Sequence, residues 1–387
     1  MSLQPACSQV LTWEGGSALN KAGMNMERVR LQNRSLILRY ILNQGAASRK
    51  EIAAVTGLTQ ASVTQITTAL IEEGFLKEVG TPGGKGGPGR REILLSLNSG
   101  NFLTFAVNVE PDRTTVGLCD LTGNAVVGND NTPLSTYFPT RNDIPPEQFL
   151  DSICSVCRQL EEQLPESKRS RIECFSFAIT GIVDRENGIS RHAYGIWEEE
   201  VNVRSIIKEK MDLPVLIENN VDAYSIAILL HGTGKKHTEI LVIKWGPGVG
   251  SSVIIDGQIY RGRHEKTAEL GHMIMVPGGK KCVCGRRGCL ETIVSARALA
   301  SYSEQERHKA LNTFARSIVN AGTILAPGRI VLYGGLAEKE ELRTELIREC
   351  ASYDPSFGEK RILYTSLSDR GRYIGPASLY IMHRIQS

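Results

Sequence analysis

The sequence lacks a long apolar run, a large net charge and the regularly paired cysteines of a disulfide framework. Its 45 Lys and Arg residues nearly balance its 42 Asp and Glu residues, which leaves a net charge of +3. Total charge alone therefore gives no argument for a nucleic-acid partner. No apolar run is long enough to cross a bilayer, and residues 1–5 lack the basic segment that opens a secretory signal. These absences predict a cytoplasmic protein without membrane spans.

The composition is that of an ordinary globular protein, with 41% hydrophobic and 22% charged residues. A chain of 387 residues is too long for one ordinary core and sufficient for two or three domains. Most of the nine cysteines are scattered, which predicts reduced thiols and no disulfide framework. The scattered ones are Cys7, Cys119, Cys154, Cys157, Cys174 and Cys350.

The remaining three cysteines lie within eight residues and follow a histidine. One imidazole and three thiolates can complete the closed tetrahedral shell that zinc prefers in a structural site. Glycines between them would let the loop fold back so that the thiols face one point. The alternatives are a cluster of buried thiols, or one disulfide with a spare thiol. The predicted ligands of a structural zinc ion are His272, Cys282, Cys284 and Cys289.

Two carboxylates flank this cluster. Glu269 precedes His272 by three residues, and Glu291 follows Cys289 by two. Metal ligation would fix the two acids relative to each other, so that they could accept hydrogen bonds from neighbouring hydroxyls of a sugar or polyol. The alternative is a pair of solvated surface acids.

The N-terminal part of the chain has helix signals in close succession. Residues 1–26 show no clear period and are predicted to be a loosely held extension, whereas residues 36–41 repeat apolar side chains at helical spacing. Ser48 and Glu51 form a capping box that begins a short helix, which Gly57 ends. Thr59 caps the next helix, with a buried stripe predicted at Val63, Ile66 and Leu70.

Two short helices joined by a glycine turn are typical of a helix-turn-helix. Residues 75–79 and 92–97 are predicted to form a hairpin with a basic tip, as in a wing that lies against DNA. A small helical interaction module is the alternative. The residues predicted to meet base edges are Thr59, Gln60, Ala61, Ser62, Thr64 and Gln65. Those predicted to lie near phosphates are Arg34, Arg39, Arg49, Lys50, Arg90 and Arg91.

From residue 102 onward, strands alternate with helices, which predicts an α/β domain with a mixed sheet. Strands are expected at 102–109, 115–119, 125–127, 175–180, 215–217, 239–243, 252–255 and 330–333. Helices are expected at 149–164 and 204–211, and a last helix at 374–385 is expected to pack on the second part of this domain.

The segment from Glu269 to Glu291, of the form ExGH…CxCGxxGCxE, resembles the signature of the ROK family of sugar-responsive repressors and sugar kinases. The resemblance runs from about residue 101 to the C-terminus, and the N-terminal arrangement resembles the winged helix-turn-helix of the repressor branch. It implies a two-lobed, actin-like (ribonuclease H-like) domain at 99–387, after an extension at 1–26 and a DNA-binding domain at 27–98. In that family the histidine and three cysteines hold zinc. The sugar contacts that it implies are Gly181, Asn219, Asn220, Glu269, His272 and Glu291.

The groups that a kinase of this family needs are missing. Where such kinases have an Asp-x-Gly-Gly-Thr turn for phosphate, this chain has an amide at Asn108, and Pro111 removes a donor amide. Asn220 falls on the catalytic aspartate, and an amide cannot accept a proton at neutral pH. Asp222 is expected to point elsewhere. The glycines at 246–250 and 334–335 are interpreted as tight strand turns.

We therefore expect a non-enzymatic regulator, a repressor that binds operator DNA as a dimer or tetramer and responds to a sugar or sugar phosphate. The alternatives are an ATP-dependent sugar kinase with a DNA-binding appendage and a regulator controlled by a protein partner. Trp197 is expected in the core, with a sugar-facing wall as the other possibility. Only 35 residues separate Glu291 from Pro327, which predicts a shortened helical subdomain and puts the closing motion and dimer contacts of the family in question.

Overall fold

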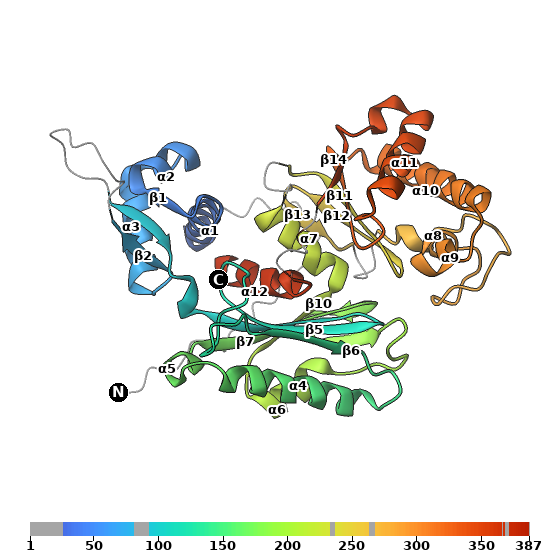
Figure 1. Ribbon diagram of the computed structural model, residues 1–387. Helices are drawn as coiled ribbons and strands as arrows, with labels where there is room; N and C mark the ends of the chain where they lie inside the picture. Colours follow the sequence, from blue (N-terminus) through green and yellow to red (C-terminus); the bar gives the residue numbers. More distant parts are fainter. Residues whose placement is uncertain are drawn as a thin grey trace.

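The computed structural model describes residues 26–80, 93–232, 237–262, 268–365, 367 and 371–386. Residues 1–25 and the predicted wing tip with Arg90 and Arg91 lie outside the described residues. The described chain forms a small N-terminal unit and two larger lobes, each built on a five-stranded sheet (Figure 1). Within these ranges, no helix combines the length and the apolar character needed to cross a membrane.

The N-terminal unit has the predicted helices and hairpin. Its elements are α1 (Met26–Gln44), β1 (Ala46–Ser48), α2 (Arg49–Thr56), α3 (Gln60–Glu72), β2 (Leu76–Val79) and β3 (Leu94–Leu97). The capping box is confirmed, because the Ser48 hydroxyl and the Glu51 carboxylate each accept a hydrogen bond from the other residue's amide. Thr59 caps α3 as predicted. The sequence did not predict β1, which pairs with β3 to complete a three-stranded sheet.

The first lobe has a sheet of order β10-β7-β4-β5-β6, with helices on both faces (Figure 1). Its strands are β4 (Leu103–Val109), β5 (Arg113–Cys119), β6 (Ser135–Pro139), β7 (Ile172–Ile179) and β10 (Val215–Asn219). Helices α4 (Pro146–Glu162) and α6 (Val203–Met211) cover one face, and α7 (Asn220–His231) and α12 (Ile374–Gln386) cover the other. The shorter elements are η1 (Ser99–Asn101), α5 (Glu166–Arg169), β8 (Ile182–Asp184) and β9 (Ile189–His192).

Two expectations for this lobe were wrong. Residues 125–127 form no strand and make only isolated bridges, Cys119 with Ala125 and Val127 with Pro133. The last helix does not pack on the second lobe. It lies against α7 and the β4–β7 face of the first sheet and also contacts α1. The apolar pattern of this helix predicts that one face is buried, but it does not indicate which lobe that face packs against.

The second lobe has the sheet order β13-β12-β11-β14-β15. The strands are β11 (Ile240–Trp245), β12 (Val249–Ile255), β13 (Gln258–Tyr260), β14 (Arg329–Tyr333) and β15 (Ile362–Tyr364). The helical elements are η3 (Leu270–His272), α8 (Glu291–Val294), α9 (Ala296–Ala300), α10 (Glu304–Leu325), α11 (Glu340–Tyr353) and η4 (Pro355–Phe357). The segment between Glu291 and Pro327 is thus filled by three helices, the last of which begins with a capping box at Ser303 and Glu306.

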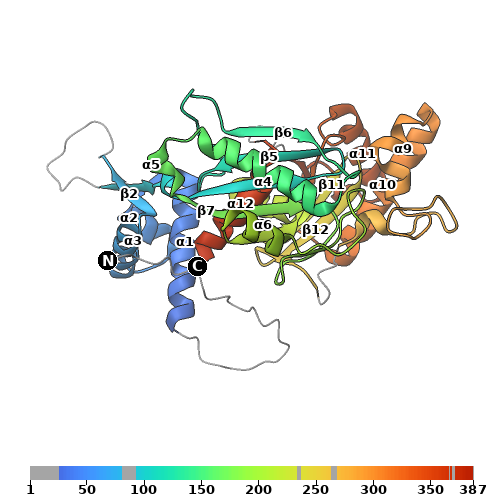
Figure 2. The ribbon, with the colours of Figure 1, turned by 90° about the horizontal axis from the view of Figure 1, so that it is seen from below.

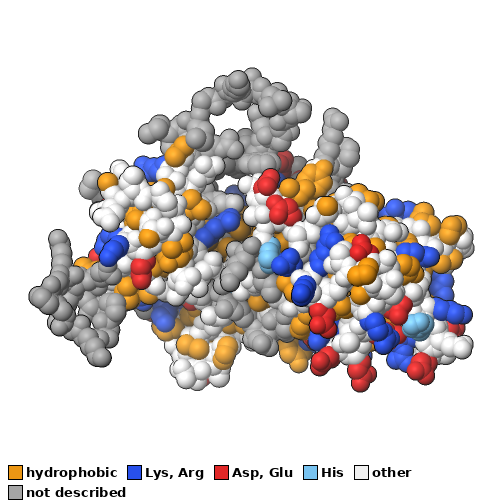
Figure 3. Space-filling view, turned by 90° about the horizontal axis from the view of Figure 1, so that it is seen from above, with side chains coloured by type: hydrophobic (Ala, Val, Ile, Leu, Met, Phe, Trp, Pro, Cys, Tyr) orange, Lys and Arg blue, Asp and Glu red, His pale blue; other side chains and the backbone are white. Residues whose placement is uncertain are grey.

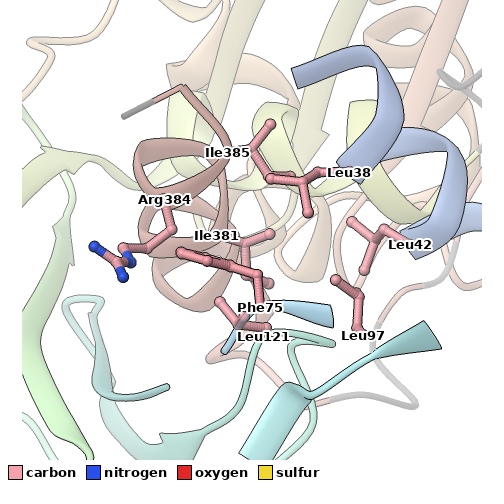
Figure 4. Close-up of a pocket in the computed structure, with 8 residues that line it drawn as sticks. All are labelled: Leu38, Leu42, Phe75, Leu97, Leu121, Ile381, Arg384 and Ile385. Atoms are coloured by element: carbon pink, nitrogen blue, oxygen red, sulfur yellow. The ribbon is translucent and has the colours of Figure 1, made fainter. Parts of the chain in front are cut away.

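The core of the N-terminal unit continues into the first lobe through α12. Leu38 of α1 and Ile381 of α12 are 2% and 1% exposed and face the same apolar seam (Figure 4). Figures 1 and 2 both show α1 beside α12. Phe75 stacks on Phe102 with ring centroids 4.3 Å apart, and the Arg384 guanidinium lies over both rings. The N-terminal unit is therefore held on the first lobe by packing as well as by the connecting chain.

Candidate functional site

The predicted metal ligands lie together at the edge of the second lobe. The ligand atoms of His272, Cys282, Cys284 and Cys289 are all within 4.8 Å of one another. Cys282 Sγ is 3.5 Å from His272 Nδ1, and the sulfurs of Cys284 and Cys289 are 3.7 Å apart. A tetrahedral zinc site with bonds of ~2.3 Å to sulfur would have ligand–ligand edges of this length. The eight cysteines among the described residues form no disulfide, so the disulfide alternative fails.

The loop reaches this geometry through glycine. Gly288 has φ of 75°, and a Cβ at this position would lie 1.6 Å from the carbonyl oxygen of Val276. Only glycine fits there. Burial raises the pKa of the Cys282 thiol to about 12 and also raises that of Cys289, whereas the Cys284 thiol differs. Burial acts to raise its pKa, but hydrogen bonds from the Arg286 side chain and backbone outweigh burial, so that the pKa is lowered. The donor set and its spacing therefore fit a closed metal site.

The two carboxylates are positioned from the metal cluster. His272 presents Nδ1 to Cys282, while its Nε2 lies 3.6 Å from the Glu269 carboxylate. A metal on Nδ1 would leave the Nε2 proton to orient Glu269. Glu291 accepts a hydrogen bond from the Val249 amide at 3.1 Å, and burial raises the pKa of this carboxyl. Glu269 and Glu291 both line one cavity, so neither is a solvated surface acid.

That cavity has a volume of about 840 Å³ and lies between the two lobes. All six residues predicted to contact a sugar line it: Gly181, Asn219, Asn220, Glu269, His272 and Glu291. Its volume falls within the ~300–1,000 Å³ usual for small-molecule sites. The structure thus brings together residues from β10, α7, η3 and α8 that are far apart in the sequence.

Asn219 is largely used by the fold. Its Oδ1 accepts hydrogen bonds from the Val221 and Asp222 amides as the cap of α7, and its Nδ2 donates to the Gly181 carbonyl at 2.6 Å. Gly181 has φ of 106°, and a Cβ there would lie 2.0 Å from the His192 carbonyl oxygen. Asn219 keeps one N–H for a ligand. Its main contribution is to fix the cavity wall.

Asn220 belongs to a buried polar cluster on the floor of the cavity. Its Nδ2 donates to Glu110 at 3.4 Å. The Glu110 carboxylate also forms ion pairs with Lys244 and with Arg372, the latter at 2.7 Å. Burial acts to raise the Glu110 pKa, but Lys244 and Arg372 outweigh it, so that the pKa is lowered. A negative charge therefore stands beside Pro111, at the turn where the sequence had already lost its phosphate-binding glycines.

Asp222 lines the cavity, contrary to the expectation that it would point elsewhere. Burial, together with the neighbouring Glu218 carboxylate, raises the Asp222 pKa to about 7. Glu218 itself is paired with Arg261 at 2.7 Å. Asn220, the first residue of α7, thus has no basic group, whereas Asp222, the third residue, has a carboxyl group that can exchange a proton near neutral pH.

Sequence reasoning missed Tyr194, which lines the cavity next to the metal cluster. Its ring meets the His272 ring edge-on, with centroids 5.5 Å apart. Burial, followed by the Glu269 charge, raises its pKa to about 12, so the phenol stays neutral. Trp197, by contrast, is 6% exposed and bonds to the Ser190 hydroxyl in the core. Tyr194 therefore supplies the aromatic wall that the sequence had offered as one role for Trp197; its only signal was an aromatic residue before Gly195 in an irregular segment.

The predicted DNA-contacting residues divide into two groups. Thr59, Gln60, Ala61, Thr64, Gln65 and Lys50 are exposed, while Ser62 is half-buried against the Thr59 hydroxyl. Arg34 and Arg39 were predicted wrongly, because they pack inward. Arg34 pairs with Glu73 at 2.6 Å, and Arg39 reaches the Met382 sulfur of α12. Burial lowers the Arg39 pKa.

Arg49 remains half-buried, with its Nε donating to Thr67 and its guanidinium 3.5 Å from Glu78. The face seen in Figure 3 carries interspersed basic and acidic side chains over the second lobe. At the predicted nucleic-acid interface, the exposed residues are therefore those at the start of α3 and Lys50.

Comparisons with known proteins agree with this division. Residues 120–313 match the model of the ROK family, and residues 30–77 match a model of winged helix-turn-helix DNA-binding domains. The xylose repressor of Bacillus subtilis (strain 168) is 30% identical over 284 residues, which make up 73% of this chain and 71% of that protein.

Two solved structures share the fold. A ROK family transcriptional regulator described as a homolog of the E. coli MLC protein has a TM-score of 0.72 at 20% identity, over 93% of this chain and 97% of that one. A ROK family glucokinase from Streptomyces griseus, in complex with glucose and AMPPNP, has a TM-score of 0.60 at 22% identity, over 72% and 98%. At these identities the likeness establishes the fold alone.

Proposed function

This chain belongs to the ROK family and carries a winged helix-turn-helix, and from this premise we propose that it is a DNA-binding repressor that senses a sugar. The observation that carries the proposal is the cavity between the lobes, where Glu269, His272 and Glu291 converge. Carboxylate and imidazole groups suit the hydroxyls of a sugar. Zinc at the His272 cluster has a structural role, because four protein ligands leave no open coordination position for catalysis.

Operator binding is assigned to the exposed start of α3, with the protein acting as a dimer or a higher even oligomer. Paired half-sites in an operator mirror the twofold symmetry of such an assembly.

Replacing Gln60 by alanine is expected to cost about 1–3 kcal/mol of operator binding and to relax the preference at one base pair. Replacing Lys50 by alanine should weaken binding to all sequences alike and reduce the salt dependence. Fluorescence anisotropy at several salt concentrations with a selected operator distinguishes the two effects. Equal losses on specific and random DNA for Gln60→Ala would contradict the assignment.

Sensing is tested by neutralising one cavity carboxylate. Glu269→Gln is expected to weaken sugar binding by about tenfold or more, because a hydrogen bond to a charged group contributes ~1.5–3 kcal/mol. The sugar is first identified from a panel by the rise in melting temperature that binding must produce. The matched control is Glu341→Gln, the same change at an exposed position of α11. If no sugar in the panel alters operator affinity of the unmodified protein, the sensing function is lost from the proposal.

A sugar kinase remains the second candidate, favoured by one observation. Asp222 lines the cavity with a pKa of about 7, which is the range of a general base. The Glu110 carboxylate opposes this function, because it occupies Lys244 and Arg372, the two cations that could otherwise bind a phosphate at the turn after β4. ATP-dependent phosphorylation of a hexose that disappears in Asp222→Asn but survives in Glu341→Gln would establish the kinase.

A further inference from the structure

The cluster around Glu110 is not explained by sugar sensing. Glu110 follows the end of β4 in the first lobe, Lys244 lies near the end of β11 in the second lobe, and Arg372 lies two residues before the start of α12. These three elements come from separate parts of the chain, yet both cations meet the same carboxylate. The Glu110 side chain is 10% exposed and that of Lys244 is 17% exposed. A fourth partner, Asn220, donates from the first residue of α7.

Two cations that converge on one buried point need an anion there. Without it, the Lys244 ammonium would be left largely buried and unpaired, which is unfavourable, whereas the Arg372 side chain is 44% exposed and would keep contact with water. Lysine and arginine are the side chains that proteins use to bind phosphate, the arginine through its planar guanidinium and the lysine as a point charge. Pro111 and Gly248 line the same cavity, and a Cβ at Gly248 would lie 2.6 Å from the Glu291 carboxylate.

We propose that Lys244 and Arg372 form a phosphate-type anion site that is permanently occupied by the protein's own Glu110 carboxylate. The internal anion joins the two lobes and the beginning of α12 without any bound nucleotide or phosphate. This proposal deepens the sensing function, since the state of the interlobe cavity then depends on the sugar alone. It also makes Glu110 a specificity-determining residue, which excludes phosphoryl groups from this end of the cavity.

The test replaces the internal anion by a neutral side chain of the same shape. Glu110→Gln is expected to bind inorganic pyrophosphate or phosphate at least tenfold more tightly than the unmodified protein, as measured by calorimetry at constant ionic strength. The anion should also raise the melting temperature of the variant but not that of the unmodified protein. The double variant Glu110→Gln/Lys244→Gln should lose the gain.

The matched control is Glu269→Gln, which removes one negative charge from the same cavity away from the two cations. Equal anion binding by Glu269→Gln and Glu110→Gln would overturn the proposal, because the gain would then reflect net charge. Strong binding of pyrophosphate by the unmodified protein would overturn it as well. If Glu110→Gln folds only when phosphate or pyrophosphate is added, that rescue supports the site. If it fails to fold with either anion, the carboxylate has a role that phosphate cannot replace, and the proposal falls.

The anion proposal and the sugar proposal can fail separately. Sugar binding by the unmodified protein does not enter the measurement with pyrophosphate. If Glu110→Gln binds the anion but the unmodified protein responds to no sugar, the proposed role of Glu110 stands and only the proposed sensing function fails.

Discussion

Loss of the metal is expected to abolish sugar binding while operator binding persists. Cys289→Ala removes one of four ligands, and a structural zinc ion contributes apparent free energies of ~10–16 kcal/mol to the peptides that it folds. The loop from Cys282 to Cys289 has few apolar contacts of its own apart from its metal ligands, and Val283 is 62% exposed. The ion would hold His272 against Cys282 and leave the Nε2 proton of His272 to orient Glu269.

The N-terminal unit should be indifferent to this change, because its core is formed by α1, α3, the hairpin and α12. The measurements are metal content, sugar binding by calorimetry and operator binding by anisotropy. Cys154→Ala is the matched control, since Cys154 is a fully buried free thiol on α4. Retained sugar affinity in a metal-free Cys289→Ala protein would show that the cluster does not support the cavity. Equal loss of operator binding would show that the cluster holds more of the molecule than the second lobe.

Features defined by neighbouring residues could be predicted from the sequence. The Ser48–Glu51 capping box and the Thr59 cap depend on residues three positions apart, and the hairpin on two strands that follow each other in the chain; all three are present. The four metal ligands fall within 18 residues, and the structure brings them together as predicted. The resemblance of the segment from Glu269 to Glu291 also identified the ROK family and its two-lobed fold, which the comparisons confirm.

What the sequence left open depends on partners far along the chain. Arg34 and Arg39 are basic residues on a helix of the predicted DNA-binding domain, which made phosphate contacts a reasonable prediction. In the structure they face inward, where they contact Glu73 and Met382. Glu110 pairs with Lys244 and Arg372, which lie 134 and 262 residues away along the chain. No local pattern encodes such pairings, because burial fixes them only when the lobes are assembled.

The lobe on which α12 packs also depends on residues far along the chain, and of these features it matters most for function. This helix packs on the first lobe, beside α7, and reaches α1 of the N-terminal unit. Helix α7 begins at the cavity with Asn220 and carries Ile226 and Leu230 in the core shared with α12. Packed side chains therefore connect the proposed sugar-binding cavity with the winged helix-turn-helix unit. Contact alone does not demonstrate coupling, which requires the sugar to favour one of two arrangements.

Ile381→Ala tests this route and is expected to separate sugar binding from operator release. The side chain is 1% exposed at the seam with Leu38 and Phe75 (Figure 4). Its truncation should destabilise the protein by about 2–5 kcal/mol. The protein should still bind sugar, whereas the ratio of operator affinities with and without sugar, ~5–150-fold for typical coupling of 1–3 kcal/mol, should fall toward one.

The matched control is Ile153→Ala, the same truncation at a fully buried position of α4 on the opposite face of the first sheet. It should cost similar stability and leave the ratio unchanged. If both variants lose the response, global destabilisation is the cause. If Ile381→Ala keeps the full response, the signal does not pass through the seam. A double-mutant cycle with Leu38→Ala then tests this interface, because two residues that line it from opposite helices should show an interaction free energy of ~0.5–3 kcal/mol, while Leu38 and Ile153 should be additive. Coupling that disappears with the Leu38–Ile381 interaction would make α12 the element that the sugar biases.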